Sequence, residues 1–183
     1  EKIISYGTTK ITIDKEYIIS TENIEFNRKS NEIFSDSKTE IQDSDKNIFI
    51  TESLIFSTDT KILKGKKVSI KYLDGNTSYF ENFFGNLVTK EFFGKDVKFL
   101  FKKDLFGNQA NDPRLYGNVF ESNKDKTKLS KGVFTTCKKK NGCPAWNIKA
   151  ENVIHDKKNK QINYKNAWLE LYDKPILYFP KFF

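Results

Sequence analysis

The strongest constraint on the fold is an alternation of apolar and polar residues that returns about every fifteen positions. Runs of β-branched and aromatic residues with period two predict strands that bury one face. Measured from Ile24 to Thr39 to Leu54 to Val68, the pattern recurs at intervals of 15, 15 and 14 residues. An interval of that length holds about two strands of five or six residues plus their turns.

Polar segments separate these runs in the first half of the chain. Residues 27–31 and 43–47 are rich in Asn, Asp, Ser and Lys, which is typical of turns. A repeat this short buries its apolar face only by stacking on its neighbours. We therefore expect an all-β fold, an antiparallel hairpin ladder whose sheet is continuous or folded over on itself. The expected strands cover residues 10–13, 23–26, 38–41, 53–56, 67–70, 97–101, 118–120, 146–150, 161–164 and 167–171.

The middle of the chain is less regular. Residues 82–85 and 91–94, each with two Phe before a Gly, look like turns or strand ends, and residues 106–114 look like a loop. No linker divides the chain, so we expect a single domain over residues 1–183.

The chain is basic, with 32 Lys and Arg against 24 Asp and Glu and a formal net charge of +8. Almost all of this charge is Lys, with Arg only at positions 28 and 114, and it is accompanied by much Asn and Ile. An AT-rich genome produces that composition without selection for a partner, and scattered Lys is typical of a solvated face. Readers of nucleic acid favour the Arg fork, so we do not expect a nucleic-acid partner.

Nothing in the sequence indicates a membrane helix or a leader. No stretch approaches the roughly 20 apolar residues that a membrane-spanning helix needs. Glu1 opens directly into sequence that looks structured, which suggests a mature or truncated chain.

Two cysteines, Cys137 and Cys143, flank a turn signal at Asn141-Gly142. A disulfide closing so short a loop would contribute about 2–2.5 kcal/mol. They are candidates for a structural disulfide in an oxidising compartment, paired with each other or with cysteines outside this chain. Free thiols are the alternative. With one distant His155, they cannot supply the four ligands of a zinc site, so no metal is expected.

We expect no enzymatic activity and no cofactor. His155 is the only histidine and lies in a polar stretch that we interpret as a turn between strands. No Ser-His-Asp arrangement, phosphate loop or metal cluster is recognisable, although the carboxylates are too numerous to exclude a glycosidase pair.

The seventeen Phe residues have two interpretations. They could fill an ordinary β-sandwich core, or they could line an open slot for an apolar ligand. Composition does not separate the two.

The last third of the chain carries four motifs in order. They are Gly132-Val-Phe-Thr-Thr-Cys137, Cys143-Pro-Ala-Trp-Asn-Ile-Lys-Ala150, Asn166-Ala-Trp-Leu169 and Pro175-Ile-Leu-Tyr-Phe-Pro180. Together they resemble the LptD family of lipopolysaccharide-assembly proteins, also called organic-solvent-tolerance or OstA-like proteins. The upstream ladder looks like the repeat of the family's N-terminal domain and of its bridge relative LptA.

The resemblance implies a V-shaped β-jellyroll, two sheets folded over an apolar groove, at the periplasmic face of the outer membrane. Its partners would be lipopolysaccharide, an LptA-like bridge protein, and in the full-length protein an outer-membrane barrel with an LptE-like lipoprotein plug. The barrel is absent from this chain. Family cysteines bridge this domain to the barrel, and the close spacing of Cys137 and Cys143 departs from that pattern. The alternative is an LptA-like or LptC-like bridge component; a basic nucleic-acid-binding or enzymatic β-domain is a more distant one.

The alternation predicts which side chains face the groove, with ordinary core packing as the competing interpretation at each. An open jellyroll also leaves an unpaired edge strand, where a matching domain can add. We expect that edge at Thr9, Ile11 and Ile13 and expect it to dock the bridge protein. The predicted groove residues are Ile24, Phe26, Ile41, Leu54, Phe56, Val68, Ile70, Phe99, Phe101, Trp146, Ile148, Tyr164 and Leu169.

Overall fold

The computed structural model describes residues 1–138 and 144–182, and within them the chain is almost entirely β. The all-β prediction is confirmed: fourteen strands pair antiparallel, with one short 3-10 helix, and no helix in these ranges is long and apolar enough to cross a membrane. The elements are β1 (Lys2–Ile13), β2 (Tyr17–Asn27), β3 (Glu32–Ser35), β4 (Thr39–Gln42), β5 (Ile48–Thr51), β6 (Ser53–Ser57), β7 (Ile62–Lys71), β8 (Thr77–Asn86), β9 (Glu91–Leu100), η1 (Lys103–Phe106), β10 (Arg114–Ser122), β11 (Lys126–Thr135), β12 (Trp146–Asp156), β13 (Gln161–Leu171) and β14 (Lys174–Phe182).

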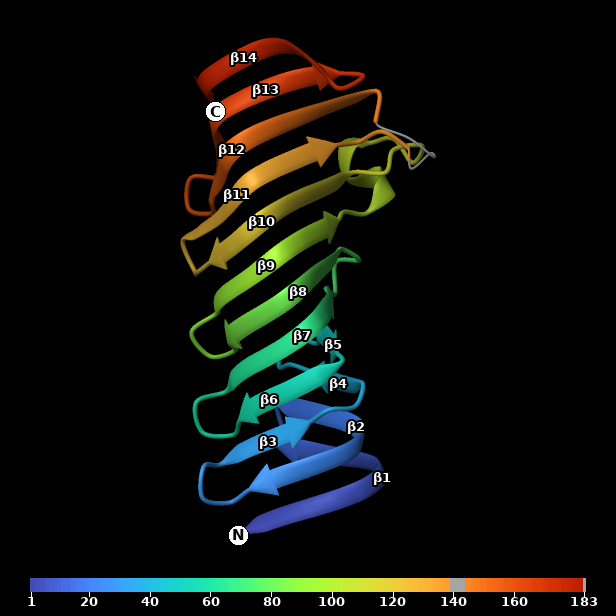
Figure 1. Cartoon of the computed structure of the whole chain (residues 1–183), viewed down its shortest axis with the longest axis vertical. Helices are drawn as coiled ribbons and strands as arrows, with labels where there is room; N and C mark the ends of the chain where they lie inside the picture. Colours follow the sequence, from blue (N-terminus) through green and yellow to red (C-terminus); the bar gives the residue numbers. More distant parts are fainter. Residues whose placement is uncertain (139–143, 183) are drawn as a thin grey trace. The chain divides into compact units, whose positions relative to one another are not determined.

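The strands follow one another as a ladder of hairpins, and Figure 1 shows β10 to β14 side by side in chain order. One edge of β2 pairs with β1, and the other pairs with β4 through residues 18–20 and with β3 through residues 25–27. Both β5 and β6 pair with β7. The pair β3 and β4, and likewise β5 and β6, therefore act as the two halves of one bent strand.

A bend at mid-strand explains the fifteen-residue period. Two exposed residues separate two inward ones, as Lys66 and Lys67 do between Gly65 and Val68. Lys67, Asp96, Lys131 and Asn166 have φ values of 49°, 51°, 51° and 49° at these points. Such an extra residue bends a strand and reverses its side-chain phase. Two short strands per fifteen-residue repeat, as predicted, occur only over residues 32–57. In the other repeats the same length of chain forms one long bent strand.

The bend folds the sheet over on itself, so that its inner side chains meet across two layers. Tyr17 lies on the half of β2 that pairs with β4, and Phe56 lies on β6, which pairs with β3. Their ring centroids are nevertheless 6.2 Å apart. Phe99 and Phe120, at 5.3 Å, meet in the same way in the second half of the chain. The architecture is therefore jellyroll-like, as the sequence predicts.

The chain divides into two compact units, residues 1–94 and 95–183, and the boundary lies inside β9. A boundary inside a strand does not by itself define two domains, so the single domain stays a prediction. The first unit is closed around large apolar side chains. Its buried apolar residues are Tyr17, Ile19, Ile24, Ile33, Ile41, Phe49, Leu54, Phe56, Leu63, Val68, Ile70, Phe80, Phe83 and Leu87.

Residues 82–85 and 91–94, expected to be turns or strand ends, are strand ends: they lie in the last part of β8 and at the start of β9. Phe83 faces inward and is buried while Phe84 faces outward, because the bend shifts the alternation there. A Cβ on Gly94 would fall on the Phe80 ring, so the close approach, and not a turn, requires this glycine.

Candidate apolar groove

The inner face of the second unit carries a row of large apolar side chains that nothing in the described residues fully covers. Leu115, Phe134, Ile148, Leu169 and Leu177 lie opposite one another, in this order, from β10 to β14. The first four are half-buried, and Leu177 is 48 % exposed. This set, called the inner row below, is a continuous apolar strip that loses its cover toward β14.

Small residues form the next row toward the bend. Gly132 lies opposite Ala150, which lies opposite Ala167, and all three are buried. A Cβ on Gly132 would come within 2.7 Å of Val153 Cγ2. Such residues fill little volume, so they let the backbone of this row lie close to the opposite layer.

Beyond the bend, the opposing layer shows the same gradient. Leu129 and Val153 are buried, whereas Tyr164 on β13 and Phe182 on β14 are half-buried. The rings of Tyr164 and Phe182 stack with centroids 4.4 Å apart. Burial raises the pKa of the Tyr164 phenol, which agrees with an apolar setting for this ring.

Aromatic rings line the other end of the groove, where the strands meet the helix η1. Phe134 makes edge contacts with Phe106 at 6.0 Å and with Trp146 at 6.1 Å. Phe99 and Phe101 stack at 6.4 Å. Edge and offset ring contacts of this kind are favourable, so they hold the rings in place without closing over them.

The predicted groove residues separate into two groups. Phe26 and the six in the second unit, Phe99, Phe101, Trp146, Ile148, Tyr164 and Leu169, are half-buried on the inner face. Those of the first unit other than Phe26 are core residues in this structure, because the opposite layer covers them; they are Ile24, Ile41, Leu54, Phe56, Val68 and Ile70. Sequence reasoning missed Leu115, Phe134, Leu177, Phe179 and Phe182, which the strand register could have supplied.

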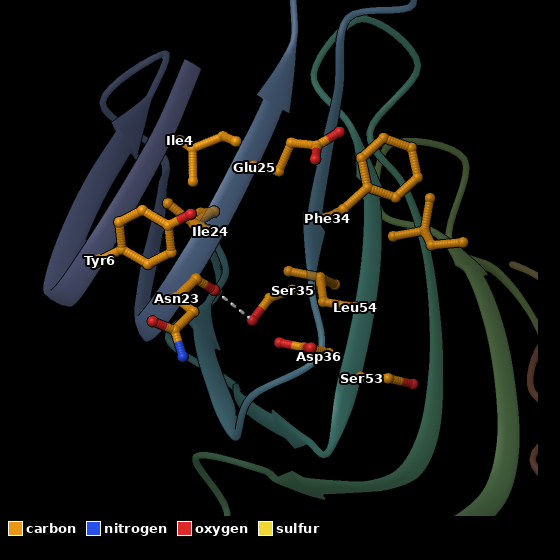
Figure 2. A pocket seen from close by; sticks show the side chains of 11 residues that line it. Ile4, Tyr6, Asn23, Ile24, Glu25, Phe34, Ser35, Asp36, Ser53 and Leu54 are labelled. Carbon is orange, nitrogen blue, oxygen red and sulfur yellow. Dashed lines mark hydrogen bonds between the residues drawn. The ribbon is translucent and has the colours of Figure 1, made fainter. Parts of the chain in front are cut away.

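A second hollow, of about 490 Å³, lies in the first unit beside β1. Figure 2 shows Ile4 and Tyr6 of β1 on one side of it and Phe34 of β3 on the other. It forms where the pairing of β2 passes from β3 to β4, and the Ser35 hydroxyl bridges this gap by donating to the Asn23 carbonyl at 2.7 Å. Two predicted groove residues, Ile24 and Leu54, line it.

The predicted docking edge belongs to β1, which among the described strands pairs only with β2. Thr9, Ile11 and Ile13 lie opposite Thr21, Ile19 and Tyr17, so they face inward and are half-buried. At the other end of the pairing order, β14 pairs only with β13 within the same described ranges. Both terminal strands thus offer backbone groups to an added strand.

Buried polar groups surround Cys137. Thr135 donates its hydroxyl to the Trp146 carbonyl at 2.7 Å, and the Arg114 guanidinium donates to the Cys137 carbonyl at 2.5 Å. Burial raises the pKa of the Cys137 thiol. Hydrogen bonds with Thr135 and with the backbone at Trp146 and Ala145, together with the positive charge of Arg114, lower the pKa by more, so that the net shift of the thiol pKa is downward. Cys143 lies outside the described residues, so the disulfide stays a prediction.

Two further expectations from the sequence concern His155 and metal binding. His155 is exposed and lies inside β12, not in a turn as the sequence suggests. Within residues 1–138 and 144–182, no three His, Cys, Asp or Glu side chains gather as a metal site requires.

A scan against protein-family models and a search of curated proteins gave no match to this chain.

Proposed function

We propose that this chain is a non-catalytic lipid-binding domain whose inner face shelters acyl chains. The observation that carries the proposal is the inner row, which stays half-buried from Leu115 to Leu169 and opens at Leu177. An acyl chain of about a dozen CH₂ groups costs on the order of 10 kcal/mol to expose to water. An apolar strip open at one end shields such a chain while a polar headgroup stays outside.

The particular role follows from the resemblance of residues 132–180 to the LptD family. We propose that the domain works at the periplasmic face of the outer membrane, receives lipopolysaccharide from an LptA-like bridge protein, and passes its acyl chains to an outer-membrane β-barrel. The bridge protein would add to the free edge of β1 at Thr9, Ile11 and Ile13. The barrel and its LptE-like plug would lie beyond β14, where the groove opens. The proposed disulfide chemistry of Cys137 and Cys143 belongs to the same oxidising compartment.

Photo-crosslinking with lipopolysaccharide tests the groove. A photoreactive residue placed at Ile148 or Leu169 should label lipopolysaccharide strongly. The matched controls are Ser69 of β7 and Tyr79 of β8, which lie opposite each other on the outer face of the first unit. Equal labelling from both pairs would contradict the proposal.

A substitution tests the same surface without a crosslinker. Leu169→Asp places a charge on the half-buried inner row and should weaken lipopolysaccharide binding, because a buried unpaired carboxylate is costly. In an antiparallel ladder every second residue directs its backbone groups to the partner strand; Ile13 and Ile11 therefore face β2, and Thr12 presents its N–H at the free edge. Thr12→Pro should weaken bridge-protein binding and leave lipopolysaccharide binding by the isolated chain intact, since Pro removes that edge donor. Bridge binding unaffected by Thr12→Pro would remove β1 as the docking edge.

A further inference from the structure

The positive charge of the chain is concentrated in the second unit. Residues 1–94 hold 13 Lys and Arg against 15 Asp and Glu, which gives a net charge of −2. Residues 95–183 hold 19 against 9, which gives +10. The expectation of a scattered charge without a partner therefore does not describe the second unit, whose surface attracts anions.

The outer face of this unit carries a row of exposed amphipathic rings. Tyr116, Val133, Lys149, Trp168 and Tyr178 lie opposite one another, in this order, from β10 to β14. Tyr116, Trp168 and Tyr178, called the outer aromatic row below, are 36, 41 and 42 % exposed. Trp168 and Tyr178 contact each other with ring centroids 4.7 Å apart.

The ring types differ from those of the inner row. The inner row holds Leu, Ile and Phe, whereas the outer aromatic row holds only Tyr and Trp, each with an apolar body and a polar group. Such rings favour the boundary between acyl chains and lipid headgroups. Ile176, on the neighbouring stretch of β14, is also exposed and extends the apolar area to the terminal strand.

Lysines accompany these rings. Lys98 Nζ lies 5.6 Å from the centroid of the Tyr116 ring. On the bend beside Trp168 and Tyr178, Lys165 of β13 lies directly opposite Lys181 of β14, and both are exposed. Like charges in direct cross-strand register repel each other. An anion shared by the two ammonium groups would remove that repulsion.

We propose that the outer aromatic row and Lys165 and Lys181 bind the surface of an anionic lipid bilayer. Charge complementarity favours an anionic bilayer as the partner, because this unit has a net charge of +10. The outer face of the first unit also exposes apolar rings, such as Phe84 and Phe93, but that unit has a net charge of −2 and should not attract an anionic surface. The inference concerns the face opposite the groove and goes beyond the proposed function. It requires neither lipopolysaccharide nor a bridge protein.

Vesicle sedimentation of the full chain tests the proposal. The chain should bind vesicles that contain phosphatidylglycerol, bind poorly to vesicles of phosphatidylcholine alone, and lose affinity as salt is added. Lys165→Gln and Lys181→Gln should each weaken binding roughly fivefold, as expected for one lysine near an anionic surface. Trp168→Ser should weaken it and abolish the blue shift of tryptophan fluorescence that vesicles induce.

Controls separate this surface from general charge and from the groove. Tyr79→Ser removes a ring of equal exposure, 42 %, from the outer face of the first unit and should leave vesicle binding unchanged. Leu169→Asp should weaken lipopolysaccharide binding and preserve vesicle binding, so the two proposals fail independently. Thermal unfolding shows that each variant is folded. Any of three results would overturn the proposal. They are equal binding to vesicles with and without phosphatidylglycerol, an affinity for soluble polyphosphate equal to that for anionic vesicles, and vesicle binding by the Trp168→Ser variant equal to that of the parent chain.

Discussion

The two units are built from the same bent strands, yet the first covers most of its inner apolar side chains and the second leaves many of them half-buried. In the described residues, fourteen apolar side chains other than proline are buried in residues 1–94 and six in residues 95–183, two of which are alanines. Both units have small inner residues near the bends, such as Gly65 and Gly94 in the first and Ala150 and Ala167 in the second. The difference lies in the cover over the inner row, which is only half-buried in the second unit. The same backbone pattern therefore serves stability in one unit and a proposed ligand in the other.

The largest expected difference lies in the cost of removing an aromatic ring. Phe56 is 0 % exposed, so Phe56→Ala should lower the free energy of unfolding by about 3–5 kcal/mol. Phe134 is half-buried, so Phe134→Ala should lower it by only about 1–2 kcal/mol, because less area is lost and no closed cavity forms. Urea unfolding measures both losses, provided that the dependence of the free energy of unfolding on urea concentration is the same in both variants and the parent chain. Equal losses would mean that the second unit is as tightly packed as the first.

Filling the inner glycines should also separate the units. Gly94→Ala drives a methyl group into the buried Phe80 ring and should destabilise the protein by about 1–3 kcal/mol. Gly132→Ala meets Val153 Cγ2 at 2.7 Å, a smaller overlap than the 2.3 Å between a Gly94 Cβ and the Phe80 ring, so the loss should be smaller, about 1 kcal/mol. Thermal unfolding checks the order; a larger loss at Gly132 would contradict the open second unit.

The charge difference should be visible in the chemistry of Cys137. In a Cys143→Ser background, the rate of alkylation by iodoacetamide should rise through a midpoint below that of an ordinary cysteine, because the pKa of the thiol is lowered. Arg114→Gln removes a nearby positive charge and should shift this midpoint to higher pH. A midpoint that does not move would show that the hydrogen bonds of Thr135 and the backbone set the pKa without the charge.

The smallest expected effect concerns the bends. Lys131 has a φ of 51°, which an L-residue adopts at a cost of about 1–2 kcal/mol, so Lys131→Gly should stabilise the protein by about 0.5 kcal/mol after the entropy of glycine is subtracted. Lys67 has the same conformation but pairs with Glu52 at 2.8 Å on an exposed surface. Loss of that weak pair should bring Lys67→Gly close to neutral. Calorimetry compares the two; an equal gain would mean that the exposed pair contributes nothing.

The limits of sequence reasoning are visible at single residues. The alternation places Ile24, Leu54 and Ile148 on the inner face alike, and the register confirms that orientation. It does not distinguish the first two, which are core, from Ile148, which is half-buried. At Phe83 and Phe84 the sequence pattern did not show that they lie in a strand, because the bend at residues 81 and 82 interrupts the alternation there.

The sequence by itself determined the all-β ladder, its polar turns, and which side of each strand faces inward, because these follow from local periodicity and turn chemistry. Only the tertiary structure decided which inward side chains are covered. The burial of an inward side chain depends on which residue of the other layer packs against it, as Phe56 packs against Tyr17. That partner is distant in sequence. The charge difference between the units, by contrast, is set by the sequence, since each unit is one continuous half of the chain and the structure supplied only the boundary at residue 94.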